Sequence, residues 1–168
     1  YGLDVYNNFV KMLNKIDEAY ATMDVYLKKR YDLIPNIVNT VKGYAAHESE
    51  TLEKVIQARN QAQGAKTMDD RAEGEEAITG SLGRLFALSE AYPDLKANTN
   101  FIDLQKQLSD IEDEIANARK YYNAVVREYN TKRETFPSRL IANFFKFEEM
   151  AMFEVASPEE RNNVTVQF

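Results

Sequence analysis

The chain has 168 residues, a net charge of −6, and a composition that is 44% hydrophobic and 29% charged. One domain of this length can bury a substantial core. The acidic balance argues against a dedicated nucleic-acid binder, which needs a basic face for phosphates. The lack of cysteine excludes disulfides, thiol catalysis and Cys-ligated metals.

The first expected helix runs from about residue 4 to residue 30. Its apolar residues recur at helical spacing, and they are Phe9, Met12, Leu13, Ile16, Tyr20, Met23 and Leu27. Asp17 and Asp24 flank this stripe, and paired carboxylates can bind a metal or act as acid and base. Helix carboxylates more often line a solvated rim, which we prefer here. The basic run 28–30 suits the negative end of the helix dipole.

A tight helical reversal is expected at Tyr31 and Asp32. Asp32 stands where an N-cap is wanted, because its carboxylate can accept from the N–H groups that follow. Pro35 then falls in the first turn of the next helix, where its missing N–H leaves little unsatisfied. The second helix is expected from about Leu33 to Gln63, with its apolar face at Ile34, Ile37, Val38, Val41, Tyr44, Leu52, Val55, Ile56 and Ala62.

The third helix, expected from about Met68 to Tyr92, is rich in small residues. Gly74, Gly80 and Gly83 lie inside it, although glycine costs about 1 kcal/mol relative to alanine in a helix. Close approach to a neighbouring helix and a locally loose helix explain them about equally well. They are not a phosphate loop, because neither the Walker A nor the Rossmann spacing occurs.

The fourth helix, from about Phe101 to Pro137, has the clearest pattern. Apolar residues alternate steps of three and four without a break, at Phe101, Leu104, Leu108, Ile111, Ile115, Ala118, Tyr122, Val125 and Tyr129. This heptad seam predicts coiled-coil-like packing. An intermolecular coiled coil is the alternative. An intramolecular bundle is preferred, because the other three amphipathic stretches need partners of their own.

The four stripes predict an all-α, antiparallel four-helix bundle over residues 1–137. A short extra C-terminal helix and an irregular tail over residues 138–168 are expected to pack on the bundle end, within the same domain. Val164, Val166 and Phe168 alternate as a strand would. The tail is crowded with apolar residues, namely Leu140, Ile141, Phe144, Phe145, Phe147, Met150, Met152 and Phe153. Burial against the bundle and an exposed contact patch are both consistent with it.

The tail also gathers positive charge. Between residues 127 and 146 the sequence has five cationic residues and two glutamates. The resulting local charge of +3 suits an anionic surface. An even number of helices would return Pro137 to the end of the bundle where the chain starts. We therefore expect a membrane or partner contact made by Arg133, Arg139, Phe144, Phe145, Lys146 and Phe147.

No catalytic, cofactor-binding or metal-ligating residues are expected, and no cofactor. The one histidine, His47, has no partner at the Glu-x-x-His spacing of a di-iron bundle or at the His-Glu-x-x-His spacing of a zinc site. No run approaches the roughly 18 apolar residues of a membrane-spanning helix.

Three stretches resemble the LemA family of bacterial proteins. They are YNNFV near the start, DEAYATMDVYLKKRYDLIPNIVNTVKGYAAHESETLEKVIQAR, and ARKYYNAVVREYNTKRETFPSRLIANFF with the FEV that follows. The resemblance covers nearly the whole chain. It implies a four-helix bundle preceded, in the full-length protein, by a short membrane-spanning helix. The first residue, Tyr1, fits a trimmed anchor. The chain departs from the family at residues 146 and 148–151, where relatives often carry a Gly/Pro/Lys linker.

The leading functional prediction is a membrane-tethered interaction or scaffold domain of the bacterial envelope. It would be anchored in the cell membrane by a single span and would bind an unidentified protein partner, but no nucleic acid. The LemA family has no established enzymatic activity, so the resemblance assigns no catalytic residue. The alternative is a ligand-sensing bundle that signals by helix shifts and needs a concave polar pocket. A hydrolase or metalloenzyme ranks third, because no nucleophile–base pair or ligand set is visible.

Overall fold

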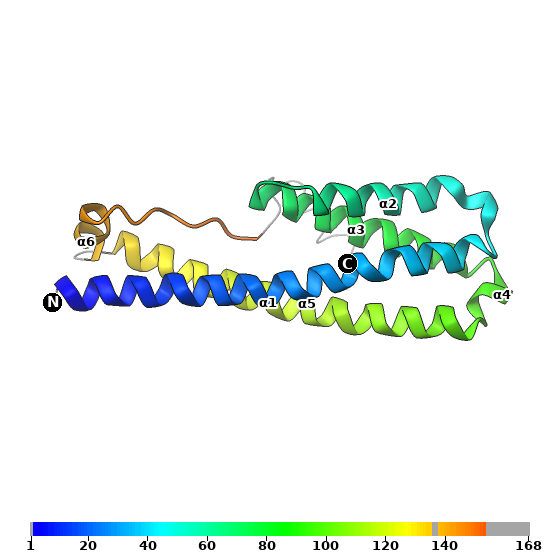
Figure 1. Ribbon diagram of the computed structural model, residues 1–168, viewed down its shortest axis with the longest axis horizontal. Helices are drawn as coiled ribbons and strands as arrows, with labels where there is room; N and C mark the ends of the chain where they lie inside the picture. Colours follow the sequence, from blue (N-terminus) through cyan, green and yellow to red (C-terminus); the bar gives the residue numbers. More distant parts are fainter. Residues whose placement is uncertain (1, 136–137, 154–168) are drawn as a thin grey trace. The chain divides into compact units, whose positions relative to one another are not determined.

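The computed structural model describes residues 2–135 and 138–153, which form helices joined by short connections (Figure 1). In chain order these are α1 (Gly2–Lys42), the 3₁₀ helix η1 (Ala46–Glu48), α2 (Ser49–Gln63), α3 (Met68–Ser89), α4 (Pro93–Lys96), α5 (Thr99–Glu134) and α6 (Ser138–Phe144). The predicted all-α class is confirmed. The strand-like pattern at Val164, Val166 and Phe168 lies outside the described residues.

The chain divides into two compact units, to both of which α1 and α5 contribute. Unit 1 comprises Tyr1–Tyr26 with Glu114–Phe153, and the described part of unit 2 is Leu27–Asp113. Unit 2 packs four helical segments around one core: the second half of α1, all of α2 and α3, and the first half of α5. Unit 1 holds two long helical segments, the short α6, and the chain that follows α6.

The reversal predicted at Tyr31 and Asp32 is wrong. The helix α1 continues through both residues to Lys42, with Pro35 inside it. Asp32 is therefore an exposed residue in the middle of a helix rather than a cap. The actual connection follows Lys42, and α2 begins at Ser49 instead of Leu33. Tyr44 and Ile56, expected on the buried face, are 43% and 39% exposed.

A contact from another helix explains how Pro35 is accommodated. Residue 35 should donate its N–H to the carbonyl of residue 31, and proline has no N–H to donate. Arg59 of α2 fills this position, because its Nε donates to the Tyr31 carbonyl oxygen at 2.8 Å. The orphaned carbonyl is thus satisfied, and α1 does not have to end.

We expect Arg59→Ala to destabilise the protein by about 1–3 kcal/mol, because it leaves the Tyr31 carbonyl without a donor. In a Pro35→Ala background the same change should cost less, since alanine at that position restores the helical N–H. Chemical unfolding of the four proteins measures this double-mutant cycle. If Arg59→Ala lowers the free energy of unfolding equally in both backgrounds, Arg59 does not replace the missing N–H of residue 35.

The heptad seam of α5 is confirmed by burial. Eight of its nine predicted positions are buried, at Phe101, Leu104, Leu108, Ile115, Ala118, Tyr122, Val125 and Tyr129. The exception is Ile111, which is half-buried. The seam is therefore the core-facing side of α5 along most of its length.

The glycines of α3 divide into two kinds. A Cβ atom on Gly74 would lie 2.6 Å from the Ala62 Cα and 2.8 Å from the Ala62 Cβ, so α2 and α3 touch there through their backbones. A Cβ on Gly80 or Gly83 would meet nothing within 4 Å. Close helix approach therefore explains Gly74 and neither of the other two.

Replacing Gly74 with alanine is expected to cost about 1–3 kcal/mol, because the added methyl group forces two packed helices apart. Gly83→Ala is the matched control on the same helix. It should stabilise by about 1 kcal/mol, as alanine favours the helix and meets open space. Thermal and urea unfolding of both variants measures the difference, and a similar stability change in the two would argue against the contact.

Candidate functional site

The six residues predicted to form a contact all belong to unit 1. Arg133 lies in the last turn of α5, Arg139 and Phe144 lie in α6, and the other three follow α6 directly. The chain reverses at Lys146, which has a positive φ of 60°. The N–H of Lys146 donates to the Asn143 carbonyl at 3.4 Å, and that of Phe147 donates to the Ala142 carbonyl at 2.9 Å. This is the usual C-terminal helix motif in which glycine takes the left-handed position, here occupied by lysine.

Three large apolar side chains around this reversal are open to solvent. Phe144 is 78% exposed, Leu140 59% and Phe145 47%. The start of α1 lies beside them, because a Cβ on Gly2 would sit 3.8 Å from Cδ1 of Ile141. Leu3, the next residue, is 77% exposed. We call Leu3, Leu140, Phe144 and Phe145 the apolar end of unit 1.

The six predicted residues do not share one environment. Arg139 and Lys146 are exposed, as are Phe144 and Phe145. Phe147 instead stacks on Phe9, with ring centroids 4.8 Å apart. The side chain of Arg133 is 20% exposed and lies near two carboxylates, at 3.3 Å from Glu134 and 3.7 Å from Glu149. Phe144 and Phe145 are therefore exposed, whereas Phe147 packs on an aromatic side chain of α1.

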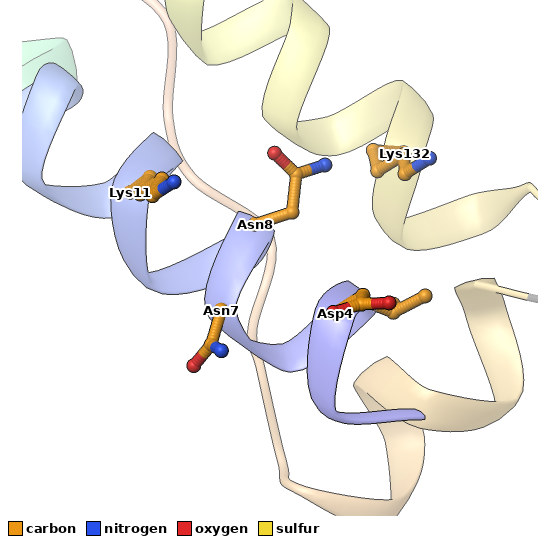
Figure 2. Close-up of a pocket in the computed structure, with 6 residues that line it drawn as sticks. Asp4, Asn7, Asn8, Lys11 and Lys132 are labelled. Atoms are coloured by element: carbon orange, nitrogen blue, oxygen red, sulfur yellow. The ribbon is translucent and has the colours of Figure 1, made fainter. Parts of the chain in front are cut away.

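A polar hollow of about 470 Å³ lies near the start of α1 (Figure 2). Its lining residues are Asp4, Val5, Asn7, Asn8, Lys11 and Lys132. Figure 2 shows the Asn8 amide directed toward α5, the helix that carries Lys132. Two further hollows continue along α1 and α5 as far as Glu18 and Ala124. Their mixed charges suit a small polar molecule held at the surface.

Residues 2–135 and 138–153 contain no group of three or more His, Cys, Asp or Glu side chains that could hold a metal ion. His47 lies exposed in η1. No helix in the same residues is long and apolar enough to cross a membrane.

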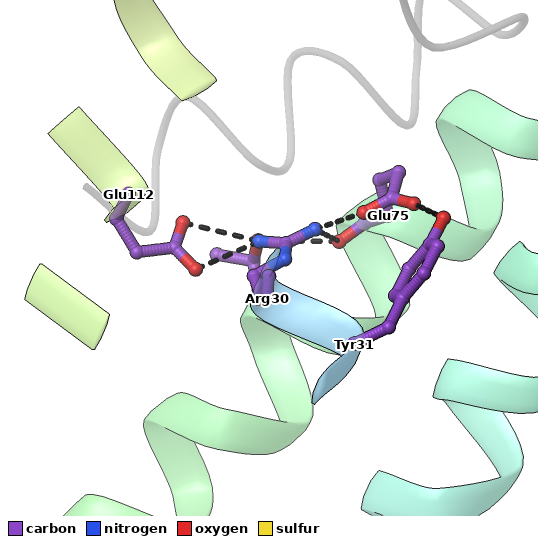
Figure 3. A network of polar contacts seen from close by, with 5 residues as sticks. Arg30, Tyr31, Glu75 and Glu112 are labelled. Atoms are coloured by element: carbon purple, nitrogen blue, oxygen red, sulfur yellow. Dashed lines mark hydrogen bonds and ion pairs between the residues drawn. The ribbon is translucent and has the colours of Figure 1, made fainter. Parts of the chain in front are cut away.

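A network of charged and polar side chains surrounds the buried Arg30 in unit 2 (Figure 3). Arg30 of α1 is 1% exposed, and its Nη1 donates to both Glu112 carboxylate oxygens of α5 at 2.8 and 3.1 Å. Nη1 also donates to Thr79 Oγ1 at 3.0 Å. Nη2 donates to the Glu75 carboxylate of α3, whose other oxygen accepts from the Tyr31 hydroxyl.

The one cation of this network, Arg30, lies between two carboxylates, those of Glu75 and Glu112. Burial alone would lower the pKa of Arg30, but attraction to Glu112 and Glu75 outweighs it and raises the pKa above its usual value. Burial is also the main reason that the pKa of Tyr31 is raised, with its bond to Glu75 adding to the effect. Arg30 thus stays a cation and Tyr31 a neutral donor. Both carboxylates are engaged, so the network stabilises the fold rather than offering a free acid or base.

Sequence reasoning missed this network. The basic run 28–30 predicts a helix C-terminus at Arg30, and that prediction is wrong because α1 continues past it. A signal was present: Leu27, Arg30 and Ile34 are spaced three and four apart, so Arg30 lies on the buried stripe of α1. A charged residue at such a position requires a buried partner.

We expect Glu75→Gln to destabilise the protein by about 3–5 kcal/mol, because it removes the charge that compensates a buried guanidinium. Glu112→Gln is the matched variant on the same arginine. Its side chain is 33% exposed, against 5% for Glu75. Water can replace part of the contact between Glu112 and Arg30, so Glu112→Gln should destabilise the protein clearly less than Glu75→Gln. Unfolding in urea compares the two, and equal destabilisation would show that Glu75 is not the principal counter-ion.

These features define an all-α bundle protein with a polar network centred on the buried Arg30 and a group of exposed apolar residues at the apolar end of unit 1. The chain belongs to the LemA family, whose sequence model matches residues 19–168.

Named relatives show the same similarity over most of the chain. Protein LemA of Metamycoplasma hominis is 29% identical over 162 residues, covering 94% of this chain and 72% of the relative. Magnetosome protein MamQ of Magnetospirillum gryphiswaldense is 26% identical over 175 residues, covering 88% of this chain. Magnetosome protein MamQ 2 of Paramagnetospirillum magneticum is 26% identical and covers 89%. The chain spans 64% of the length of each magnetosome relative, just under two thirds.

Proposed function

We propose that the chain is a membrane-tethered interaction or scaffold domain of the bacterial envelope. We further propose that the apolar end of unit 1 rests on the surface of the bilayer. The exposure of Phe144 at this end, 78%, is the observation that carries the proposal. Large apolar side chains that gather in solvent mark a surface that another phase or protein covers.

The chemistry around Phe144 favours a lipid surface. Arg139 and Lys146 are exposed beside it, and each cation near an anionic membrane contributes about 1 kcal/mol. Phenylalanine and leucine add apolar contact at the headgroup boundary. The start of α1 lies at the same end, which is where the family resemblance implies a membrane anchor. An anchor there would hold the apolar end against the bilayer.

We propose no reaction for this domain. The family resemblance implies none, and the carboxylates of Glu75 and Glu112 in unit 2 are held by Arg30. A ligand-sensing bundle is the second candidate, and the hollow shown in Figure 2 is the observation in its favour. It ranks second because Asp4, Asn7, Asn8 and Lys11, which line the hollow, are exposed and so are shared with water.

Flotation with vesicles of phosphatidylcholine and phosphatidylglycerol tests the membrane contact. The unmodified chain should float with the vesicles, and Phe144→Ser combined with Phe145→Ser should weaken binding by about tenfold or more, through lost apolar burial. Lys146→Gly should weaken it less. It removes one cation, and glycine accepts the positive φ of that position.

Val25→Ser is the matched control for this experiment. Val25 is 51% exposed on α1, about 33 Å along the helix from Leu3, and its replacement should leave binding unchanged. Absence of flotation by the unmodified chain would reject the membrane contact. So would equal binding by the double variant and the parent.

A further inference from the structure

The chain that follows α6 is bound by side chains rather than by secondary structure. Residues 147–153 contain no helix or strand, and Figure 1 shows them as an extended trace. Their main-chain groups are bonded by side chains from the part of α5 that belongs to the same unit. The phenol of Tyr129 donates to the Glu148 carbonyl at 2.7 Å, and that of Tyr122 donates to the Ala151 carbonyl at 3.1 Å.

Two asparagines of α5 each hold both main-chain groups of one residue. Asn130 accepts from the Met150 N–H at 2.9 Å and donates to the Met150 carbonyl at 2.9 Å. Asn123 accepts from the Phe153 N–H at 2.7 Å and donates to the Phe153 carbonyl at 3.1 Å. A side-chain amide can do this because it carries a donor and an acceptor side by side. The pairing reproduces what a neighbouring β-strand offers to an extended peptide.

The spacing of the asparagines matches an extended chain. Asn123 and Asn130 are seven residues apart, a rise of about 10.5 Å along a helix. Met150 and Phe153 are three residues apart, which is about 10 Å in an extended chain. Two helical turns of α5 therefore correspond to three residues of bound peptide.

Aromatic residues fix both ends of the bound segment. Phe147 stacks on Phe9 with ring centroids 4.8 Å apart. Phe153 is 1% exposed, with the Arg119 guanidinium 5.4 Å from its ring centroid. Between them Glu148, Glu149 and Ala151 are exposed. The site thus recognises main chain and two aromatic side chains, and it leaves most intervening side chains free to vary.

We propose that Arg119, Tyr122, Asn123, Tyr129 and Asn130 form a binding site for an extended peptide of a partner protein. The peptide carries aromatic residues six positions apart and N–H groups, hence no proline, at the positions of Met150 and Phe153. Residues 147–153 are its intramolecular occupant and competitor. A second copy is a poorer ligand, because exchanging identical segments gains no contact while association costs entropy.

A fluorescent peptide spanning residues 146–154 (KFEEMAMFE) is the probe, and anisotropy is the measurement. Chains of all 168 residues carrying Phe153→Ala or Met150→Pro have a weakened internal occupant and an unaltered α5. Each should bind the peptide at least about tenfold more tightly than the parent chain. Using two opening variants keeps the test decisive if one fails to fold, and circular dichroism reports their helicity.

Two matched changes test whether the asparagines read the main chain. Asn123→Ala added to an opened variant should weaken binding about tenfold, since two hydrogen bonds are lost. A peptide with proline at the position of Met150 should bind about tenfold more weakly than the parent peptide. The proposal is overturned if the opened, helical variants bind no tighter than the parent, or if they bind both peptides equally.

If the unmodified chain forms a dimer and the peptide dissociates it, the occupant is the segment of a second copy. This result would overturn the proposal of a partner protein. The experiment contains no lipid. Its failure is therefore distinguishable from a failure of the membrane contact, on which this inference does not depend.

Discussion

One turn of α1 ties together all four helical segments of unit 2. Arg30 reaches Glu75 on α3 and Glu112 on α5, and the carbonyl of Tyr31 accepts from Arg59 on α2. A buried guanidinium loses several kcal/mol of hydration, so it requires its carboxylates in place. Apolar stripes alone would allow neighbouring helices to slide by a turn. Charge pairs across three helices fix their registers, since a slip would strand a buried charge.

The same turn shows where sequence reasoning succeeds and where it fails. The apolar stripes predicted the helical class and nearly the whole α5 seam, because helical periodicity follows from local geometry. The predicted reversal at Tyr31 and Asp32 was wrong although Asp32 and Pro35 are typical of a helix start. A proline inside a helix is tolerated when the carbonyl four residues before it, which the proline cannot bond, accepts from another donor. That donor, Arg59, is 28 residues away from Tyr31 and belongs to another helix, which no local pattern can indicate.

The sequence shows which residues could form the candidate contact, but it does not show which of their side chains are exposed. The sequence shows several phenylalanines close together, and the helix end at Lys146 decides which of them are open to water. The sequence does not predict the positive φ of Lys146, because glycine is the usual residue at such a position. Asn123 and Asn130 are visible at a spacing of seven. Their pairing acquires meaning only when an extended segment lies along the helix with the matching rise.

The side chains of α5 explain why an extended segment, rather than another helix, packs on α5 in unit 1. A helix satisfies its own main-chain groups, whereas an extended chain needs outside donors and acceptors for each buried group. Tyr122, Asn123, Tyr129 and Asn130 supply them, so this face selects extended over helical chain. The segment they hold begins at Phe147, directly after the reversal at Lys146 that ends α6. A ligand that displaces it would remove the Phe9–Phe147 contact.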